Sequence, residues 1–254
     1  MPFDGTRKAA LIMAHPGHET LLHHWLETER PTVFALTDGS GGAGRSRLDC
    51  SRELIEGAGA SCGGAFGWAP DRLWYQAVLN HHAAPFLDAL ASIEAECAAC
   101  DVATLVCDPV ELFNPIHDLA NALTHALAAR LERRYGRSVG VSIYPIEDAS
   151  RFRRDARRLP LDTAAAARKR AAIRRYTPLA HEYPRYENLA TQDHEILAPD
   201  APAFAWPPVL QEVPYYERFG QARLAERRYD ALITYADHVR PLALEILQAA
   251  LVAA

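Results

Sequence analysis

Residues 8–19 read KAALIMAHPGHE, an apolar run that stops at a turn holding two histidines. The apolar run from Lys8 to Ala14 predicts a short buried strand, and the stretch after the turn predicts a helix to about Glu29. A buried strand that leads directly into a helix is the first half of a βαβ unit, which belongs to a parallel sheet. The stretch therefore predicts an α/β fold with polar groups at the carboxyl end of its first strand.

The same alternation continues along the first 145 residues. Buried strands are expected over residues 32–37, 65–68, 102–107 and 139–144, with helices from near residue 51, over 83–99 and over 117–135. Apolar strands separated by helices predict a doubly wound parallel sheet, and we expect the order 3-2-1-4-5 with helices on both faces.

Residues 146–254 have a different character. Ten basic residues lie between Arg151 and Arg175, and a Pro-rich stretch over 199–214 leads to helices expected over 221–229 and 234–251. This part is too loop-rich for a core of its own. We therefore expect one domain over 1–254, with a core sheet in 1–145 and a cap with C-terminal helices in 146–254.

Composition limits the classes of function. The chain has 254 residues, of which 49% are hydrophobic and 23% charged, so it can bury a sizeable core. A net charge of -5 argues against a nucleic-acid partner. No stretch approaches the roughly 20 apolar residues of a membrane span, and the start of the chain lacks the apolar run of a signal peptide. We expect a cytoplasmic protein with a small-molecule substrate, no nucleic-acid or membrane partner, and a homo-oligomer as an open possibility.

Three histidines follow the strand ends that this topology brings together. His15 and His18 come after the first strand, and His117 comes shortly after the fourth, which would be its neighbour where the strand order reverses. Neutral imidazole is a common ligand of zinc-like metals, and three protein ligands leave a position open for water. The sequence predicts a divalent metal site, with zinc as the expected ion. The alternative is that His18 and His117 are polar residues at helix starts.

The turn and four further motifs resemble the PIG-L/LmbE-like family of zinc-dependent N-deacetylases. The matching fragments are Ala14-His15-Pro16-Gly17-His18-Glu19 for A-H-P-D-D-E, Thr37-Asp38-Gly39, Arg52 with Glu56, Asn114-Pro115-Ile116-His117 for H-P-D-H, and Lys169, Ala172 and Tyr176. The resemblance covers most of the first 180 residues. It implies a Rossmann-like single domain that removes N-acyl groups from glycosides.

The resemblance also implies roles, and it shows departures from the family pattern. It places the metal ligands at His15, His18 and His117, with His18 in place of an aspartate. Gly17 stands where the family has its general base, and Asn114 and Ile116 replace a histidine and an aspartate of the second motif. Replacement of a carboxylate ligand by neutral imidazole raises the charge of the metal site from about +1 to +2, which lowers the pKa of bound water.

Other polar residues are candidates for catalysis or substrate binding. The catalytic candidates are Glu19, Asp118 and Asn114, with Asp108 and Glu111 as further possible bases. Arg45, Arg47 and Arg52 follow a Gly-rich loop, where they either bind an anionic group of the substrate or lie on a solvated surface. Arg52, together with Tyr144 and His181, is expected to contact the substrate.

These observations predict a metal-dependent hydrolase of N-acyl bonds that deacetylates an amino sugar or a related small metabolite. Two alternatives stay open. The absence of both family aspartates is compatible with a relative that keeps the metal and binds a ligand or partner without hydrolysis. Three imidazoles also suit iron, nickel or copper, and therefore a different metal-centred reaction such as redox chemistry.

Overall fold

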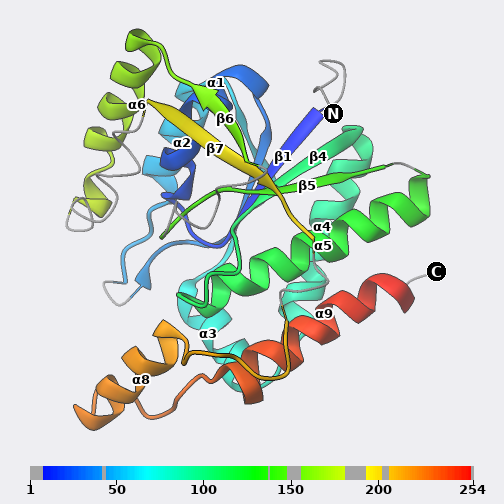
Figure 1. The fold of residues 1–254 in the computed structure, drawn as a ribbon, viewed down its shortest axis with the longest axis vertical. Coiled ribbons are helices and arrows are strands. Elements are labelled where there is room, and N and C mark those ends of the chain that lie inside the picture. The colour runs from blue at the N-terminus through cyan, green and yellow to red at the C-terminus, as the bar shows by residue number, and fades with distance from the viewer. Residues whose placement is uncertain are drawn as a thin grey trace.

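The computed structural model describes residues 8–41, 44–136, 138–147, 156–180, 193–201 and 206–252. Its centre is a sheet in the order β3-β2-β1-β4-β5-β7-β6 (Figure 1). The strands are β1 (Lys8–Met13), β2 (Thr32–Thr37), β3 (Ser61–Ala69), β4 (Val102–Cys107), β5 (Gly140–Ile143), β6 (Arg157–Pro160) and β7 (His194–Pro199). The first five strands are parallel, which confirms the predicted α/β class and the order 3-2-1-4-5.

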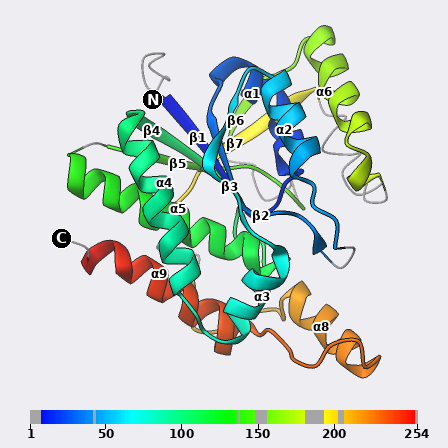
Figure 2. The same ribbon diagram turned by 180° about the vertical axis from the view of Figure 1, so that it is seen from behind.

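Helices cover both faces of the sheet (Figures 1 and 2). They are α1 (His23–Glu29), α2 (Leu48–Gly57), α3 (Asp71–Leu79), α4 (Ala84–Ala99), α5 (Pro115–Tyr135), α6 (Thr163–Arg175), α8 (Tyr215–Ala225) and α9 (Arg240–Val252). Short helical turns are η1 (His18–Leu22), η4 (Thr177–Leu179) and the π-helical turn η6 (Tyr235–Val239). None of these helices combines the length and the apolar character that a membrane crossing needs.

Strand β1 is buried on both sides, which explains its unbroken apolar sequence. Ala10 and Ile12 pack into the core that α3, α4, α5 and α9 share, whereas Leu11 and Met13 pack into a second core under α1 and α2. A strand that buries alternate residues in two cores reads as one continuous apolar run. The site described below lies at the end of this strand.

The region after residue 146 contributes to the sheet as well as to its surroundings. Strands β7 and β6 add to the β5 edge in antiparallel order, and α9 packs along α5 in the shared core. Asp200, just after β7, accepts hydrogen bonds from Asn121 (2.8 Å) and His125 (2.9 Å) of α5. These contacts tie the end of β7 to the helix that carries His117.

Strand β3 begins at Ser61, earlier than the sequence predicts, because Gly63 and Gly64 hide the strand pattern. A Cβ at Gly63 would overlap the Phe34 ring of the neighbouring strand, so the close approach of β2 and β3 requires glycine there. Helix α3, which follows β3, was not predicted at all. It begins at Asp71, a residue that reaches the site.

Candidate metal centre

The three predicted ligands meet at the carboxyl ends of β1 and β4. His15 follows β1, His18 opens η1, and His117 lies in the first turn of α5. All three are buried. The ring centroids are 4.5 Å apart for His18 and His117, 5.1 Å for His15 and His117, and 5.7 Å for His15 and His18.

His15 is held by groups that leave one of its nitrogens available. Its Nδ1 lies 2.9 Å from Thr37 Oγ1 and 3.0 Å from Asp71 Oδ1. Burial alone would raise the pKa of Asp71, but the contacts with His15 and the Gly41 N–H outweigh burial and lower it to about 2. Because an ionised carboxylate only accepts, the contact with Asp71 favours the tautomer of His15 that has its proton on Nδ1. Nε2 is buried and has no hydrogen-bond partner among the described residues.

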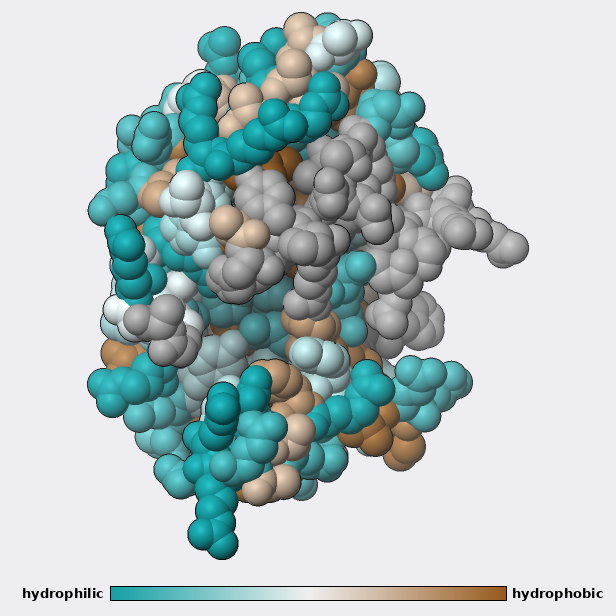
Figure 3. Space-filling model, turned by 90° about the vertical axis from the view of Figure 1, so that its left-hand side faces the viewer, coloured by the Kyte–Doolittle hydropathy of each residue, from teal (hydrophilic) through white to brown (hydrophobic). Residues whose placement is uncertain are grey.

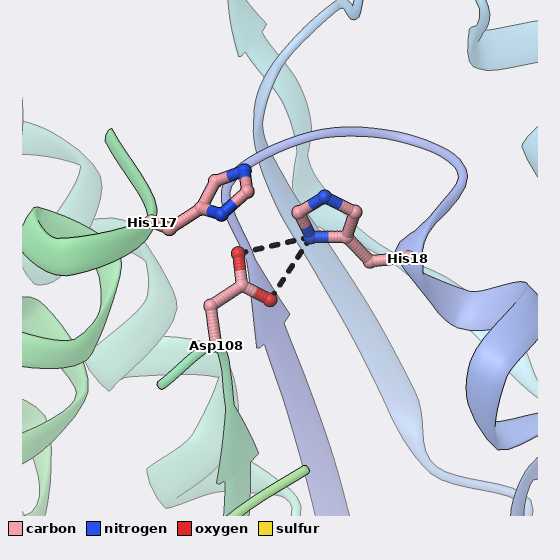
Figure 4. A group of neighbouring side chains, drawn as sticks. All are labelled: His18, Asp108 and His117. Carbon is pink, nitrogen blue, oxygen red and sulfur yellow. Dashed lines mark hydrogen bonds and ion pairs between the residues drawn. The ribbon is translucent and has the colours of Figure 1, made fainter. Parts of the chain in front are cut away.

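His18 is held in a similar way by Asp108, the residue directly after β4. Its Nδ1 lies 3.1 and 3.0 Å from the two oxygens of this buried carboxylate. Burial alone would lower the pKa of His18, but the Asp108 charge and hydrogen bond outweigh burial and raise it. The other ring nitrogen lies on the edge that points away from Asp108 (Figure 4).

Asp108 is also bound by two other donors. Ala14 N–H donates to Oδ2 at 2.8 Å, and the Tyr144 hydroxyl donates to Oδ1 at 2.5 Å. Each oxygen of Asp108 therefore faces two protein donors. This carboxylate changes the charge of the site that the sequence predicts. His18 replaces a negatively charged ligand by a neutral one, but Asp108 places a carboxylate directly behind His18.

Two sets of residues could hold a divalent ion here. One potential ligand atom from each of His18, Asp108 and His117 lies within 4.8 Å of the others. The alternative set is the three imidazoles, whose ring centres would be about 5 Å apart around one tetrahedral zinc. The observed centroid separations bracket this value, although only the set with Asp108 has its ligand atoms within 4.8 Å of one another. Nε2 of His15 is buried and makes no hydrogen bond to a described residue. The residues present therefore fit a zinc-like ion.

The catalytic candidates of the sequence analysis all support the local backbone. Glu19 accepts hydrogen bonds from Gly17 N–H (2.6 Å) and Ser51 Oγ (2.5 Å), and burial raises its pKa. Asn114 caps α5 by accepting from Ile116 N–H at 2.8 Å. Asp118 accepts from Leu112 N–H at 3.2 Å, and burial raises its pKa well above the usual range. Their catalytic roles stay predictions.

Two of the expected substrate-binding residues, Arg52 and Tyr144, lie in different settings. Arg52 is exposed on α2, where it pairs with Glu56 at 3.7 Å and lies over the Phe66 ring. Tyr144 is fully buried and bonded to Asp108 rather than exposed to a substrate. His181 lies outside the described residues.

Gly17 occupies a backbone conformation that resists the aspartate of the family pattern. Its φ is +119°, and a Cβ there would lie 2.6 Å from Leu179 Cδ1. Residues other than glycine rarely adopt such a φ. The structure thus explains Gly17 by the shape of the turn between the two histidines.

A groove of about 220 Å³ lies beside the loop that leads to His117, between this loop and the start of α8. The space-filling view of this side shows a hollow across the middle of the face, between the parts formed by α6 and α8 (Figure 3).

Comparison with known proteins supports the fold. No family model matches the sequence, and no curated protein matches it. A solved structure that is similar to this chain is the crystal structure of the antimicrobial reagent A40926 pseudoaglycone deacetylase Dbv21, with a TM-score of 0.51 and 18% sequence identity. The match covers 77% of this chain and 97% of that chain. At this identity the likeness establishes a shared fold.

Proposed function

We propose that the protein is a metal-dependent hydrolase that removes an N-acyl group, in particular acetyl, from an amino sugar or a related small metabolite. The observation that carries the proposal is the buried histidine cluster, in which Nε2 of His15 has no hydrogen-bond partner within the described ranges of the chain. The fold is shared with a protein named as a deacetylase, which supports this class of reaction. The groove beside the His117 loop offers room for the rest of a small substrate.

We propose His15, His18 and His117 as the ligands, with zinc as the ion. Metal-binding histidines almost always donate their second ring N–H to a carboxylate or carbonyl group, which fixes the orientation of the ring. Asp71 and Asp108 occupy this position behind His15 and His18. Both Asp108 oxygens already face protein donors, so Asp108 suits an orienting role better than a ligand role.

A divalent ion in this site would polarise an acyl carbonyl. It would also lower the pKa of a water bound to it, so that this water could act as a nucleophile near neutral pH. The protein residues supply orientation and a dry environment. Asp71 and Thr37 hold His15 in one tautomer, and Asp108 does the same for His18. Burial of all three rings strengthens their electrostatic interactions with a substrate.

A second candidate function is a metal-retaining protein that binds its ligand without hydrolysis. The carboxyl groups of Glu19, Asp71, Asp108 and Asp118 all accept contacts from protein groups in the described part of the chain. Burial also raises the pKa of Glu19 and Asp118, which disfavours the ionised form that a general base needs, and Asp71 and Asp108 each hold a histidine. The loss of a general base typically costs about 10²–10⁴-fold in rate.

Metal analysis combined with an acetate-release assay tests both proposals. We expect zinc in the wild type, its loss in His15→Ala and in His117→Ala, and full retention in the control His82→Ala, which changes an exposed histidine. Full metal content in His15→Ala, with loss in His18→Ala and Asp108→Ala, would assign the ion to the set that contains Asp108.

The same proteins are then incubated with a panel of N-acetylated amino sugars and amines. Hydrolysis predicts acetate release by the wild type and by His82→Ala but not by His15→Ala. If the metal-loaded wild type releases no acetate across the panel, the hydrolase proposal is wrong and the non-hydrolytic function is supported.

A further inference from the structure

Arg47 lies beside the turn that carries two of the histidines. Its Nε donates to the Gly39 carbonyl oxygen at 2.6 Å, which fixes the guanidinium group. A Cβ on Gly39 would lie 2.6 Å from this Nε and 3.2 Å from Pro16 Cδ. The guanidinium group and the turn between His15 and His18 therefore pack against the same glycine.

Arg47 also lies beside the end of α6. The Tyr176 hydroxyl oxygen is 3.5 Å from the Arg47 carbonyl oxygen and 2.8 Å from Ser51 Oγ. Ser51 Oγ in turn donates to Glu19, the residue next to His18. The backbone of Arg47 is therefore close to the end of α6 and to the residues that hold the histidine turn.

Arg47 has no acidic partner within the described part of the chain, although it is partly buried. Other arginines differ in this respect, because Arg52 pairs with Glu56, Arg168 with Glu27, and Arg130 with Glu94. The only side-chain hydrogen bond of Arg47 to a described residue uses Nε. Neither terminal nitrogen bonds to a described residue, and the two form the planar fork that matches a carboxylate or phosphate group.

We propose that Arg47 binds an anionic oxygen group of the substrate, either a carboxylate or a phosphate. The N-acyl compound would then carry its negative charge close to the reacting acyl group. This inference rests on the proposed function for the position of the acyl group, whereas the anion site itself needs no turnover. It also separates the three arginines singled out in the sequence, because Arg45 is exposed and Arg52 is paired on the surface of α2.

Calorimetric binding to the metal-loaded protein tests the site without requiring hydrolysis. N-acetylglucosamine is the neutral probe, and N-acetylglucosamine 6-phosphate and N-acetylmuramic acid carry a phosphate and a carboxylate. We expect the wild type to bind at least one charged probe more tightly than the neutral one. Arg47→Met should weaken that charged probe roughly tenfold to a hundredfold and leave the neutral probe unchanged.

Two further variants separate binding from a structural role of Arg47. Arg47→Gln keeps an amide that can donate to Gly39, and it should lose the preference for charge while retaining the metal content and thermal midpoint of the wild type. Arg45→Met is the matched control on the same loop and should keep the preference. The charged probe that is preferred identifies the anion as phosphate or carboxylate.

The proposal is overturned if the wild type binds all three probes equally, or if the preference for charge persists in both Arg47→Met and Arg47→Gln. These outcomes differ from a failure of the proposed function. Acetate release without a preference for charge would leave the hydrolase intact and remove the anion site. A preference for charge without acetate release would support the anion site and contradict the hydrolase proposal.

Discussion

At the scale of single residues, Asp71 and Asp108 act on the histidine cluster from opposite sides. Asp71 comes from α3 and contacts His15, and Asp108 comes from the end of β4 and contacts His18. In a neutral imidazole, each carboxylate favours the tautomer with the proton on Nδ1, which leaves the lone pair of Nε2 for an ion. The loss of a carboxylate that orients a ligand typically weakens metal binding by about 10–100-fold.

Asp71→Asn should therefore bind zinc about 10–100-fold more weakly than the wild type. The measurement is a competition titration against a chelator of known affinity. Asp49→Asn is the control, because Asp49 is an exposed acidic residue in the first turn of α2. An unchanged zinc affinity in Asp71→Asn would show that the contact with His15 does not position the ligand.

Gly17→Asp introduces the aspartate that the resembled family has at this position. We expect it to destabilise the protein rather than to supply a general base. The backbone φ of +119° and the contact with Leu179 both oppose a side chain there. A strained backbone conformation of this kind costs on the order of 1–3 kcal/mol. Urea unfolding should show a loss of this size in Gly17→Asp and in Gly17→Ala.

The variant Gly17→Asp/Leu179→Ala separates the two causes, since it removes the contact and keeps the backbone strain. A Gly17→Asp protein that is as stable as the wild type and releases acetate faster would contradict the expectation. The turn would then be able to accommodate the aspartate of the family.

At the scale of elements, a buried ion pair joins α6 to β7 and to the start of α1. Lys169 Nζ lies 2.8 Å from Glu195 Oε1 and 2.5 Å from the Leu21 carbonyl oxygen. Glu195 also accepts from the N–H groups of His24 and Trp25 at the start of α1, where a helix favours negative charge. The family resemblance pointed to Lys169 in the sequence. In the structure, its ammonium group binds the carbonyl oxygen of Leu21 in η1, the helical turn that begins at His18.

Lys169→Met should destabilise the protein by about 3–5 kcal/mol, because it leaves the Glu195 carboxylate buried without its cation. Lys169→Met/Glu195→Gln should recover part of this loss, since the remaining charge is removed. Arg168→Met is the matched control, because Arg168 forms an exposed pair with Glu27 on the same helix, and surface pairs contribute little. Equal unfolding free energies for Lys169→Met and Arg168→Met would contradict the prediction.

The elements that the sequence predicted are those with a strong local pattern. Strands β1, β2 and β4 are short apolar runs between helices, so their type and order could be predicted from residues alone. Strand β7 pairs in antiparallel order with β5 and with the edge strand β6. Both strands come late in the chain, and neither has a comparable apolar run. Helix α3 was missed because the strand before it contains Gly63, Gly64 and Gly67.

The same difference explains what could be predicted of the site. His15, His18 and His117 follow strong strands, and the switch in strand order places such positions together. Asp108 follows the same rule, although the sequence analysis considered it as a base and not as the partner of His18. Asp71 carried no local signal, because it follows the glycine-containing β3 and opens the helix that was not predicted.

At the scale of the whole molecule, the histidine cluster joins segments that the rest of the fold holds in two layers. His15 and His18 are linked to the layer of α1, α2 and α6 through Glu19, Ser51 and Tyr176. His117 belongs to α5, which packs with α4 and α9 on the other face. An ion bound by all three residues would cross-link the two layers at the end of β1.

Zinc should therefore raise the midpoint of thermal unfolding of the whole domain. At a free zinc concentration of about 100 times the Kd, binding to the folded state alone adds about 2.7 kcal/mol of stability. For a chain of this size, that corresponds to a rise on the order of 5–10 °C. Calorimetry with and without zinc should show this rise in the wild type and in His82→Ala, and none in His15→Ala/His117→Ala. A wild type whose midpoint does not respond to zinc, or a double variant that responds equally, would show that the ion does not link the two layers, because a ligand stabilises a fold only through its greater affinity for the folded state.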